Sequence, residues 1–301
     1  MITKPWRKRV AALGAVVCAT AVGGGEAAPA GSKSKMEQLR LCTGQEGGTY
    51  FPVGNEIKRI TGKLDVVVVE TQGSIENLVQ MANGGCDAAI VQADALGYFE
   101  KANQGKMAPL ERMDHLYDEY AHLICHKGAA LEEITDMKRH PSQFAVAMEP
   151  EGSGSYLTWR VWGIHFPAYA KVEVKQVPFN EGLEMVGTGI EAQCLLYVGG
   201  INSQQMRMAD EDDRLRLIPI NDPVFKGIKD PFGHSAFQST GFPEGIYGNL
   251  LALAAPKNQT VSVKAVLVIN QDWIAAHNGG YQEFRTAVAK AKNGIRDVLG
   301  Y

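Results

Sequence analysis

One glycine-rich stretch near the start of the chain decides the fold: Thr43-Gly44-Gln45-Glu46-Gly47-Gly48-Thr49-Tyr50-Phe51-Pro52-Val53-Gly54. A short apolar run over 39–42 precedes it and is predicted to be a strand, and residues 55–60 come after it with a helical pattern. The stretch is therefore a turn between a strand and a helix. Such a turn presents unpaired backbone N–H groups and the positive end of a helix dipole, and its glycines let a ligand approach the backbone closely.

Three more turns of this kind occur later in the chain, each rich in small polar residues and each placed after an apolar run predicted to be a strand. They cover residues 70–74, 92–94 and 149–155. In open α/β sheets, ligands bind outside the carboxyl ends of the strands. The sequence therefore predicts one ligand cleft, built from four loops of two sheets.

The alternation of strands and helices predicts two α/β domains. The first domain is predicted to be discontinuous, with residues 31–123 and 249–301, and the second to cover residues 124–217. Residues 218–248 are rich in Pro, Gly and polar side chains and are predicted to be an irregular connection.

Two apolar runs lie where the chain must change domain, over residues 120–126 and 249–255. We expect both to be strands that lie side by side, so that the two domains are joined by a two-strand hinge. Residues 261–270, 271–277 and 281–298 are predicted to be helices that pack back on the first domain.

The first 30 residues differ from the rest of the chain. Four basic residues between positions 4 and 9 precede an apolar run over 10–23 and the small residues 27–30. This pattern predicts a cleaved signal peptide over residues 1–30, a periplasmic location and no stable membrane insertion afterwards. Cleavage leaves 26 Lys and Arg against 32 Asp and Glu, a net charge of −6. That charge argues against nucleic acid or an anionic membrane as partner.

Four cysteines remain after cleavage: Cys42, Cys86, Cys125 and Cys194. All four lie in apolar runs, and free cysteine is among the most buried residue types, so four buried thiols are the favoured interpretation. A Cys42–Cys86 disulfide is the alternative if their strands are neighbours, because an exported protein permits disulfides.

His122, Cys125 and His126 lie close together in the sequence, as metal ligands often do. On a strand, however, residues 122 and 126 share one face while residue 125 lies on the other. Because no third ligand has a suitable spacing, we predict no metal site and interpret both histidines as core or surface residues.

The order and spacing of the turns resemble a known family. The matching segments are Thr43–Gly54, Glu70-Thr71-Gln72-Gly73-Ser74-Ile75-Glu76-Asn77-Leu78, Ala88-Ala89-Ile90-Val91-Gln92-Ala93-Asp94, Ile134-Thr135-Asp136-Met137 and Gly152-Ser153-Gly154-Ser155. Together with the signal peptide, they make the chain similar to the TAXI type of solute-binding protein, the extracytoplasmic receptors associated with TRAP transporters. The resemblance covers roughly residues 39–200, and the sequence departs from the family pattern at Gly199-Gly200-Ile201-Asn202.

This resemblance implies a type II periplasmic-binding-protein fold, in which two α/β domains close on a ligand. It implies a small-molecule solute and the membrane permease subunits of a TRAP-type transporter as partners, and no cofactor; we expect a monomer. Residue by residue, it places ligand-binding roles on Gly48, Thr49, Tyr50, Ser74, Asn77, Gln92, Ser153, Gly154 and Ser155. Helix capping is an alternative of equal weight for Ser74 and Ser155, and is the favoured role of Asp94.

The charges of the four loops bear on the ligand. They contain no Lys or Arg, and their charged residues are Glu46, Glu70, Asp94, Glu149 and Glu151. A carboxylate would be held by neutral donors, and an ammonium group could face an acid. The family's known ligands include glutamate, glutamine and small dicarboxylates, and we favour an amino acid over a dicarboxylate.

Two other functions compete with transport. A sensory binding protein would present its closed form to a membrane kinase instead of a permease, and the sequence does not separate these two. An enzyme on the same fold is disfavoured, because the loops hold no Ser-His-Asp order with a nucleophile elbow and no cysteine with a nearby base. The spacing of Gly44, Gly47 and Gly48 also differs from the dinucleotide-binding fingerprint.

Overall fold

The computed structural model describes residues 36–103, 109–251 and 259–300. Residues 36–301 form one compact unit, and the predicted signal peptide lies outside the described residues. Within the described ranges, no helix has the length and apolar character needed to cross a bilayer.

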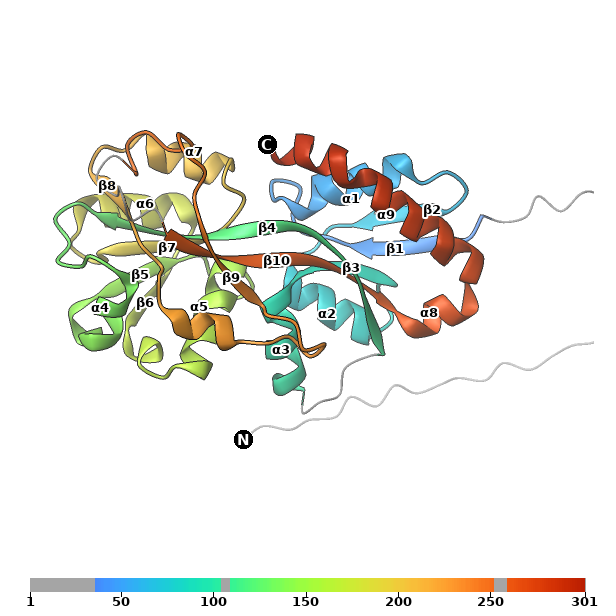
Figure 1. Cartoon of the computed structure of the whole chain (residues 1–301), viewed down its shortest axis with the longest axis horizontal. Coiled ribbons are helices and arrows are strands. Elements are labelled where there is room, and N and C mark those ends of the chain that lie inside the picture. Colours follow the sequence, from blue (N-terminus) through green and yellow to red (C-terminus); the bar gives the residue numbers. More distant parts are fainter. Residues whose placement is uncertain (1–35, 104–108, 252–258, 301) are drawn as a thin grey trace, which may run out of the picture. The chain divides into compact units, whose positions relative to one another are not determined.

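The described strands form one mixed sheet in the order β2-β1-β3-β10-β4-β7-β5-β6, with β8 beside β4 and β9 beside β10 (Figure 1). The strands are β1 Gln38–Cys42, β2 Asp65–Val69, β3 Ala88–Gln92, β4 Leu110–His126, β5 Ala145–Met148, β6 Glu173–Gln176, β7 Cys194–Gly199, β8 Leu215–Ile218, β9 Phe237–Gly241 and β10 Gln259–Asn270. A parallel triplet lies at each end: β2-β1-β3, called here the first half, and β7-β5-β6, called the second half. The antiparallel pair β4 and β10 joins them.

Helices cover both halves of the sheet. They are α1 Tyr50–Ile60, α2 Ser74–Ala82, α3 Ala93–Ala102, α4 Ile134–Arg139, α5 Gly154–His165, α6 Phe179–Thr188, α7 Gln204–Asp210, α8 Gln271–Ala276 and α9 Asn278–Leu299, with 3-10 turns η1 Pro141–Gln143, η2 Tyr169–Lys171 and η3 Pro223–Gly227.

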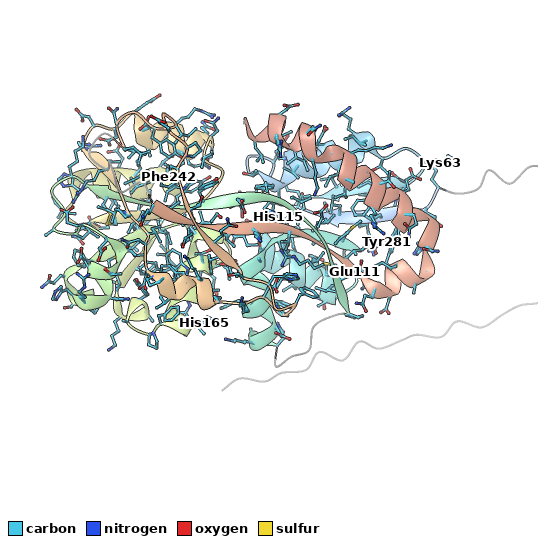
Figure 2. The ribbon with its side chains drawn as sticks, in the orientation of Figure 1. Lys63, Glu111, His115, His165, Phe242 and Tyr281 are labelled. Atoms are coloured by element: carbon cyan, nitrogen blue, oxygen red, sulfur yellow. A yellow bond between two sulfur atoms is a disulfide. The ribbon has the colours of Figure 1, made fainter. Side chains whose placement is uncertain are left out.

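The last helix belongs to the first half, as the sequence predicts. α9 packs beside α1 (Figure 1). Its residues Phe284, Val288 and Ile295 recur at helical spacing and are buried in the same cluster as Ile57 of α1. Tyr281 of α9 also donates a hydrogen bond of 2.6 Å to Glu111 of β4 (Figure 2).

One prediction about the hinge is confirmed and another is wrong. Residues 120–126 form the end of the long strand β4. Of the predicted partner over 249–255, residues 249–251 form a turn instead of a strand, and residues 252–255 lie outside the described residues. The second crossing strand is β10, which pairs with β4 from Ser262↔Tyr120 to Asn270↔Leu110.

The segment that forms β10 includes residues 261–270, which the sequence analysis assigns to a helix. The strand is rich in Val, Ile and Thr, which favour strands. Because β10 is buried on both faces, it lacks the alternation of polar and apolar residues that marks a half-exposed strand. The predictions of helices at α8 and α9 are confirmed.

The connection predicted to be irregular contains regular structure. It includes η3 and the strand β9, which pairs antiparallel with β10. Phe225 of η3 stacks on Trp162 of α5 with ring centroids 4.3 Å apart, and Phe237 of β9 lies on the same indole. This part of the chain therefore packs as a cover over α5.

The prediction of four buried thiols is wrong, because the cysteines form two disulfides. Cys42 is bonded to Cys86, the alternative interpretation of the sequence, since β1 lies next to β3 and Cys86 comes just before β3. Cys125 is bonded to Cys194, because the antiparallel register of β4 and β7 sets these two residues directly opposite one another.

Candidate functional site

The first predicted ligand loop connects β1 to α1. Gly48 is exposed and its N–H donates to the Gln45 carbonyl over 2.8 Å, while Thr49 is half-buried and makes no side-chain capping bond. Tyr50 is buried, with its hydroxyl 3.2 Å from Glu119 Oε2 and 3.4 Å from Ser74 Oγ. The loop thus brings one phenol to the centre of the sheet and leaves Thr49 able to donate.

The two predicted residues of α2 are both buried. Ser74 Oγ accepts a hydrogen bond of 2.9 Å from the Gln92 backbone N–H, at the end of β3. The Asn77 amide donates to the carbonyls of Thr43 and Ile90 at 2.6 and 2.7 Å, and its oxygen accepts from Thr71. Asn77 therefore ties three strand ends together, and its donors are engaged within the protein.

The predicted residues of the second half lie at the start of α5. Ser153 is the N-cap: its hydroxyl oxygen accepts from the Tyr156 N–H at 3.2 Å, and it donates to the Glu149 carbonyl. Ser155 is buried, and its hydroxyl oxygen accepts from the Val198 N–H at 3.0 Å, near the end of β7. Ser153 caps the helix, whereas Ser155 fixes the helix to the neighbouring strand.

The loops of the two halves meet in this structure. A Cβ atom placed on Gly154 would come within 2.6 Å of Gln92 Nε2, so the Gln92 amide lies directly against the start of α5. Nearby, the Thr158 hydroxyl of α5 donates a buried hydrogen bond of 2.8 Å to Asp94 Oδ2 of α3. The predicted residues Gln92 and Gly154 are therefore in contact across the two halves.

Two carboxyl groups are buried where the halves meet: Asp94, and Glu119 in the middle of β4. Burial raises the pKa of Asp94 to about 7, although the hydrogen bond from Thr158 lowers it. Burial also raises the pKa of Glu119 to about 7 and the charge of Asp94 adds to the rise, whereas hydrogen bonds with Gln92, Tyr50 and Tyr117 lower it. Among the described residues, neither carboxyl forms an ion pair.

Two acceptor oxygens at this point have no side-chain hydrogen-bond donor in the described part of the chain, although the backbone N–H groups of Asp94 and Ala95 lower the pKa of the Asp94 carboxyl. They are Gln92 Oε1 and Asp94 Oδ1, both fully covered. Buried acceptors without donors are costly, about 1–3 kcal/mol each, and are rare in native proteins unless something else binds them. Among the described residues, the site therefore has an excess of acceptors and two acids without a countercharge.

The sequence analysis missed Glu119 and gave Asp94 a different role. The N-cap of α3 is Gln92, and Asp94 lies in the first turn without capping it, so capping by Asp94 is wrong. Glu119 comes just before the apolar run over 120–126 that is predicted to be a crossing strand. An acidic residue beside such an apolar run is the feature of the sequence that could have drawn attention to it. Only the pairing of β4 with distant strands places it near Tyr50, and the sequence does not predict that pairing.

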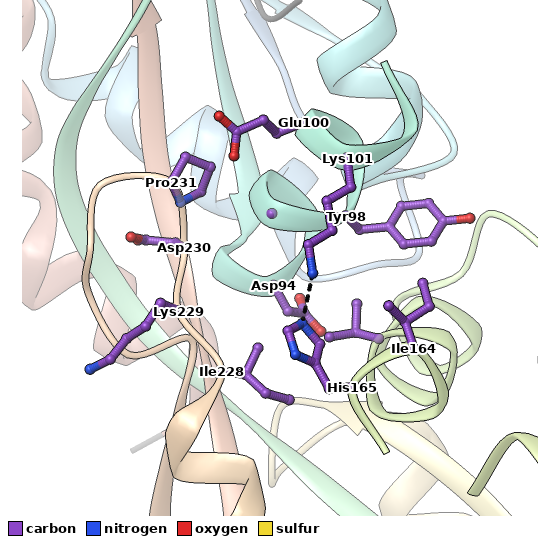
Figure 3. Close-up of a pocket in the computed structure, with 12 residues that line it drawn as sticks. Asp94, Tyr98, Glu100, Lys101, Ile164, His165, Ile228, Lys229, Asp230 and Pro231 are labelled. Carbon is purple, nitrogen blue, oxygen red and sulfur yellow. Dashed lines mark hydrogen bonds between the residues drawn. The ribbon is translucent and has the colours of Figure 1, made fainter. Parts of the chain in front are cut away.

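A cavity of about 80 Å³ lies beside these loops, between α3, α5 and the segment 228–231 (Figure 3). Asp94 lines it, and the Lys101 ammonium lies 3.4 Å from His165 Nε2 at its edge (Figure 3). None of the nine predicted ligand residues lines this cavity. We therefore take the meeting point of the loops, and not this cavity, as the candidate site.

The histidine on β4 has a structural environment. His122 is buried, its Nε2 lies 2.9 Å from the Tyr247 hydroxyl, and it stacks on Phe242. Burial lowers its pKa to about 3, so the ring is neutral at physiological pH. The interpretation of His122 as a core residue is confirmed. In the ranges that the structure describes, no three His, Cys, Asp or Glu side chains are grouped to hold a metal ion.

Known structures of the same architecture define the class of fold. The ligand-binding component of an ABC-type import system from Staphylococcus aureus is similar with a TM-score of 0.52 and 10% identity, over 87% of this chain and 78% of that one. The periplasmic aliphatic sulphonate-binding protein from Escherichia coli is similar with a TM-score of 0.51 and 13% identity, over 87% and 77%. The predicted type II periplasmic-binding-protein fold is confirmed.

The family is shown by the sequence itself. Residues 41–276 match the NMT1-like family, and the chain belongs to that family. The match begins at β1 and ends at α8, so it includes both halves and both crossing strands.

Proposed function

We propose that this protein is the extracytoplasmic solute-binding subunit of a TRAP-type secondary transporter, of the TAXI type, and that it captures an amino acid by closure of its two halves. The contact of Gln92 with Gly154 across the halves is the observation that carries this proposal. It joins loops at the carboxyl ends of strands from both triplets, which is where open α/β sheets bind ligands. The family and the fold support a binding role over an enzymatic one.

Closure requires a hinge, and we propose that β4 and β10 are that hinge. Both strands run from one half to the other (Figure 1), and they pair with one another along most of β10. The halves would then be the two domains of the receptor, with residues 31–123 and 249–301 in one and 124–217 in the other. A signal peptide over residues 1–30 would deliver the receptor to the periplasm, where it would act as a monomer.

The preference for an amino acid over a dicarboxylate is part of this proposal. The buried acids Asp94 and Glu119 stand at the meeting point of the loops, where a second carboxylate on the ligand would be repelled. A zwitterion has a positive group to offer them. The hydroxyl of Thr49 is available for its carboxylate.

The test combines identification of the ligand with a measurement of closure. Native protein purified without refolding is denatured, and the released small molecules are analysed by mass spectrometry. The molecule found is then titrated by calorimetry and by small-angle scattering. We expect an amino acid, and a smaller radius of gyration in its presence. Release of a dicarboxylate that binds tightly, with no heat from any amino acid, would refute the ligand class, and an unchanged radius at saturation would refute closure.

A further inference from the structure

The middle of β4 carries one of the two buried acids of the meeting point, Glu119. Polar groups face it from several elements, among them the phenol of Tyr50 from α1, the amide of Gln92 from β3 and the phenol of Tyr117 from β4. Besides the phenols of Tyr50 and Tyr117, the titratable group that acts on it is Asp94 of α3. Burial raises the pKa of Tyr197 on β7, and the charges of Glu149 and Glu119 both add to the rise. Every hydrogen-bond donor to Glu119 among the described residues is neutral.

The inventory of donors and acceptors points to a missing donor. Gln92 Oε1 and Asp94 Oδ1 are buried acceptors that lack a side-chain donor among the described residues, and Gln92 and Asp94 both act directly on Glu119. An ammonium group has three N–H donors and no acceptor, and its charge would balance a buried carboxylate. Its three N–H donors therefore match the three acceptor side chains, and its positive charge is opposite to that of the carboxylates.

The hydroxyls that the sequence analysis offers to a carboxylate are largely engaged. Ser74 and Ser155 each accept from a backbone N–H, and Ser153 both accepts and donates within its own turn. The centre of the site thus has few free donors and several free acceptors. Whatever enters it is selected mainly by its own N–H donors.

We propose that Glu119 binds the ammonium group of the ligand, with Gln92 Oε1 and Asp94 Oδ1 accepting its other two N–H bonds. Glu119 is then the specificity-determining residue of the receptor, and it comes from the hinge strand and not from a loop. This proposal rests on the proposed function of solute capture.

A proton accompanies capture. Without ligand, burial holds the Glu119 pKa near 7, which favours the neutral carboxyl in the lower part of the physiological range. The ammonium group stabilises the carboxylate, so the carboxyl proton leaves to solvent as the ligand binds. Affinity is therefore highest near pH 8, and the proton that Glu119 releases lowers it by about tenfold for each pH unit below 7. Burial also raises the pKa of Asp94 to about 7, so the Asp94 carboxyl adds to this fall.

The experiment compares ligands with and without an ammonium group. Glutamate, 2-hydroxyglutarate and 2-oxoglutarate share a carbon skeleton, glutamine carries one charge fewer, and 1,4-diaminobutane has ammonium groups without a carboxylate. Each is titrated by calorimetry at pH 6, 7 and 8. We expect the amino acids to bind at least a hundredfold more tightly than the hydroxy and oxo acids, with affinity rising from pH 6 to pH 8.

Two variants assign the effect to Glu119. Glu119→Gln should lose the hundredfold preference together with the part of the pH dependence that Glu119 contributes, and only the part contributed by Asp94 should remain. Glu111→Gln is the matched control, because it makes the same change on the same strand where the carboxyl meets Tyr281 (Figure 2), and it should behave as the wild type. If Glu119→Gln fails to fold, Tyr50→Phe replaces it. Loss of the Tyr50 hydrogen bond raises the Glu119 pKa, so the midpoint of the pH dependence should move to higher pH.

The outcomes separate this proposal from the proposed function. Equal binding of glutamate and 2-oxoglutarate, or a preference that survives in Glu119→Gln, overturns the role of Glu119 and leaves solute capture standing. An unmoved pH midpoint in Tyr50→Phe also overturns it. If 1,4-diaminobutane is the only compound that binds, the role of Glu119 in binding an ammonium group is supported and the proposal of an amino acid as ligand is overturned. If none of the five compounds binds and no solute is released from the native protein, the proposed function fails and the role of Glu119 fails with it.

Discussion

Two buried serines, one in each half of the molecule, do the same work. Ser74 of α2 and Ser155 of α5 each lie in the first turn of a helix and accept a hydrogen bond from a backbone N–H at a strand end, at 2.9 and 3.0 Å. The halves differ in the residues at and after that strand end. In the first half they are Gln92 and then Asp94, two positions further along the chain, and in the second half they are Gly199 and Gly200.

The difference indicates a division of labour between the halves. The first half brings the acceptors Gln92 Oε1 and Asp94 Oδ1, whereas the second half brings the Thr158 hydroxyl and the close approach of Gly154. The buried acids of the meeting point therefore come from the first half and from β4. The second half can approach the first closely, because Gly154 has no side chain at the contact and the Gln92 amide can lie against the start of α5.

Among the changes that test this comparison of the halves, we expect removal of either disulfide to have the largest effect on stability. Cys42–Cys86 closes a separation of 44 residues within the first half, and Cys125–Cys194 closes 69 residues between β4 and the second half. Loop-closure entropy predicts losses of about 4 kcal/mol for each pair, slightly more for the longer one. The double variants C42S/C86S and C125S/C194S, unfolded in urea, measure this.

Their control is the wild type treated with a reductant, which should lose stability by about the same amount as both pairs together. A C125S/C194S variant as stable as the wild type would show that the antiparallel register of β4 and β7 holds that edge without the bond. The same outcome for C42S/C86S would make the same point for β1 and β3.

The sequence predicts the elements of this molecule better than their pairing. Glycine turns and apolar runs identify the strands and helices of both halves, since those signals are local. β10 is not predicted from the sequence, because a strand buried on both faces lacks alternating polar and apolar residues. The Cys125–Cys194 disulfide is not predicted either, because it depends on the register between two strands that are far apart in the sequence. Glu119 is missed for the same reason: its partners come from other elements.

The candidate site divides in the same way. Gln92 and Gly154 meet as a strand end and a helix start should, and the motif alone predicts both. The motif also includes Asn77, whose buried amide is engaged with Thr43, Ile90 and Thr71, so its ligand role stays a prediction without support from geometry. A motif records which residues occur together and does not say which of them face the ligand.

The second change removes, from each half in turn, the hydrogen bond that a buried serine hydroxyl accepts from a backbone N–H. Ser74→Ala and Ser155→Ala each leave a buried backbone N–H without its acceptor, which costs about 1–3 kcal/mol. We expect losses of about 2 kcal/mol for both variants in urea unfolding. Ser153→Ala, which removes a half-buried helix cap and its hydrogen bond to the Glu149 carbonyl, should cost about 1 kcal/mol. A loss in Ser74→Ala or Ser155→Ala no larger than in Ser153→Ala would mean that these bonds are not the shared support of the two halves.

The smallest change tests the contact between the halves itself. In Gly154→Ala, the new Cβ would lie 2.6 Å from Gln92 Nε2 and 3.1 Å from its Cδ and Oε1, so the flexible end of Gln92 must move aside. The clash exists only where the halves meet, so it should weaken ligand binding by about tenfold, at the low end of the cost of overpacking. Stability against urea should stay within about 1 kcal/mol, because alanine suits a helix at least as well as glycine. Calorimetry with the amino acid that binds most tightly measures the first effect.

Gly279→Ala is the matched control for this change, because the same substitution in α9 meets nothing within 4 Å. It should leave both affinity and closure unchanged. If Gly154→Ala binds as tightly as Gly279→Ala and shows the same decrease in radius of gyration with ligand, then Gln92 does not lie against Gly154 in the bound form. The second half would in that case have to recognise the ligand through another part of α5, and the division of labour between the halves would need to be redrawn around Ser155 and Thr158.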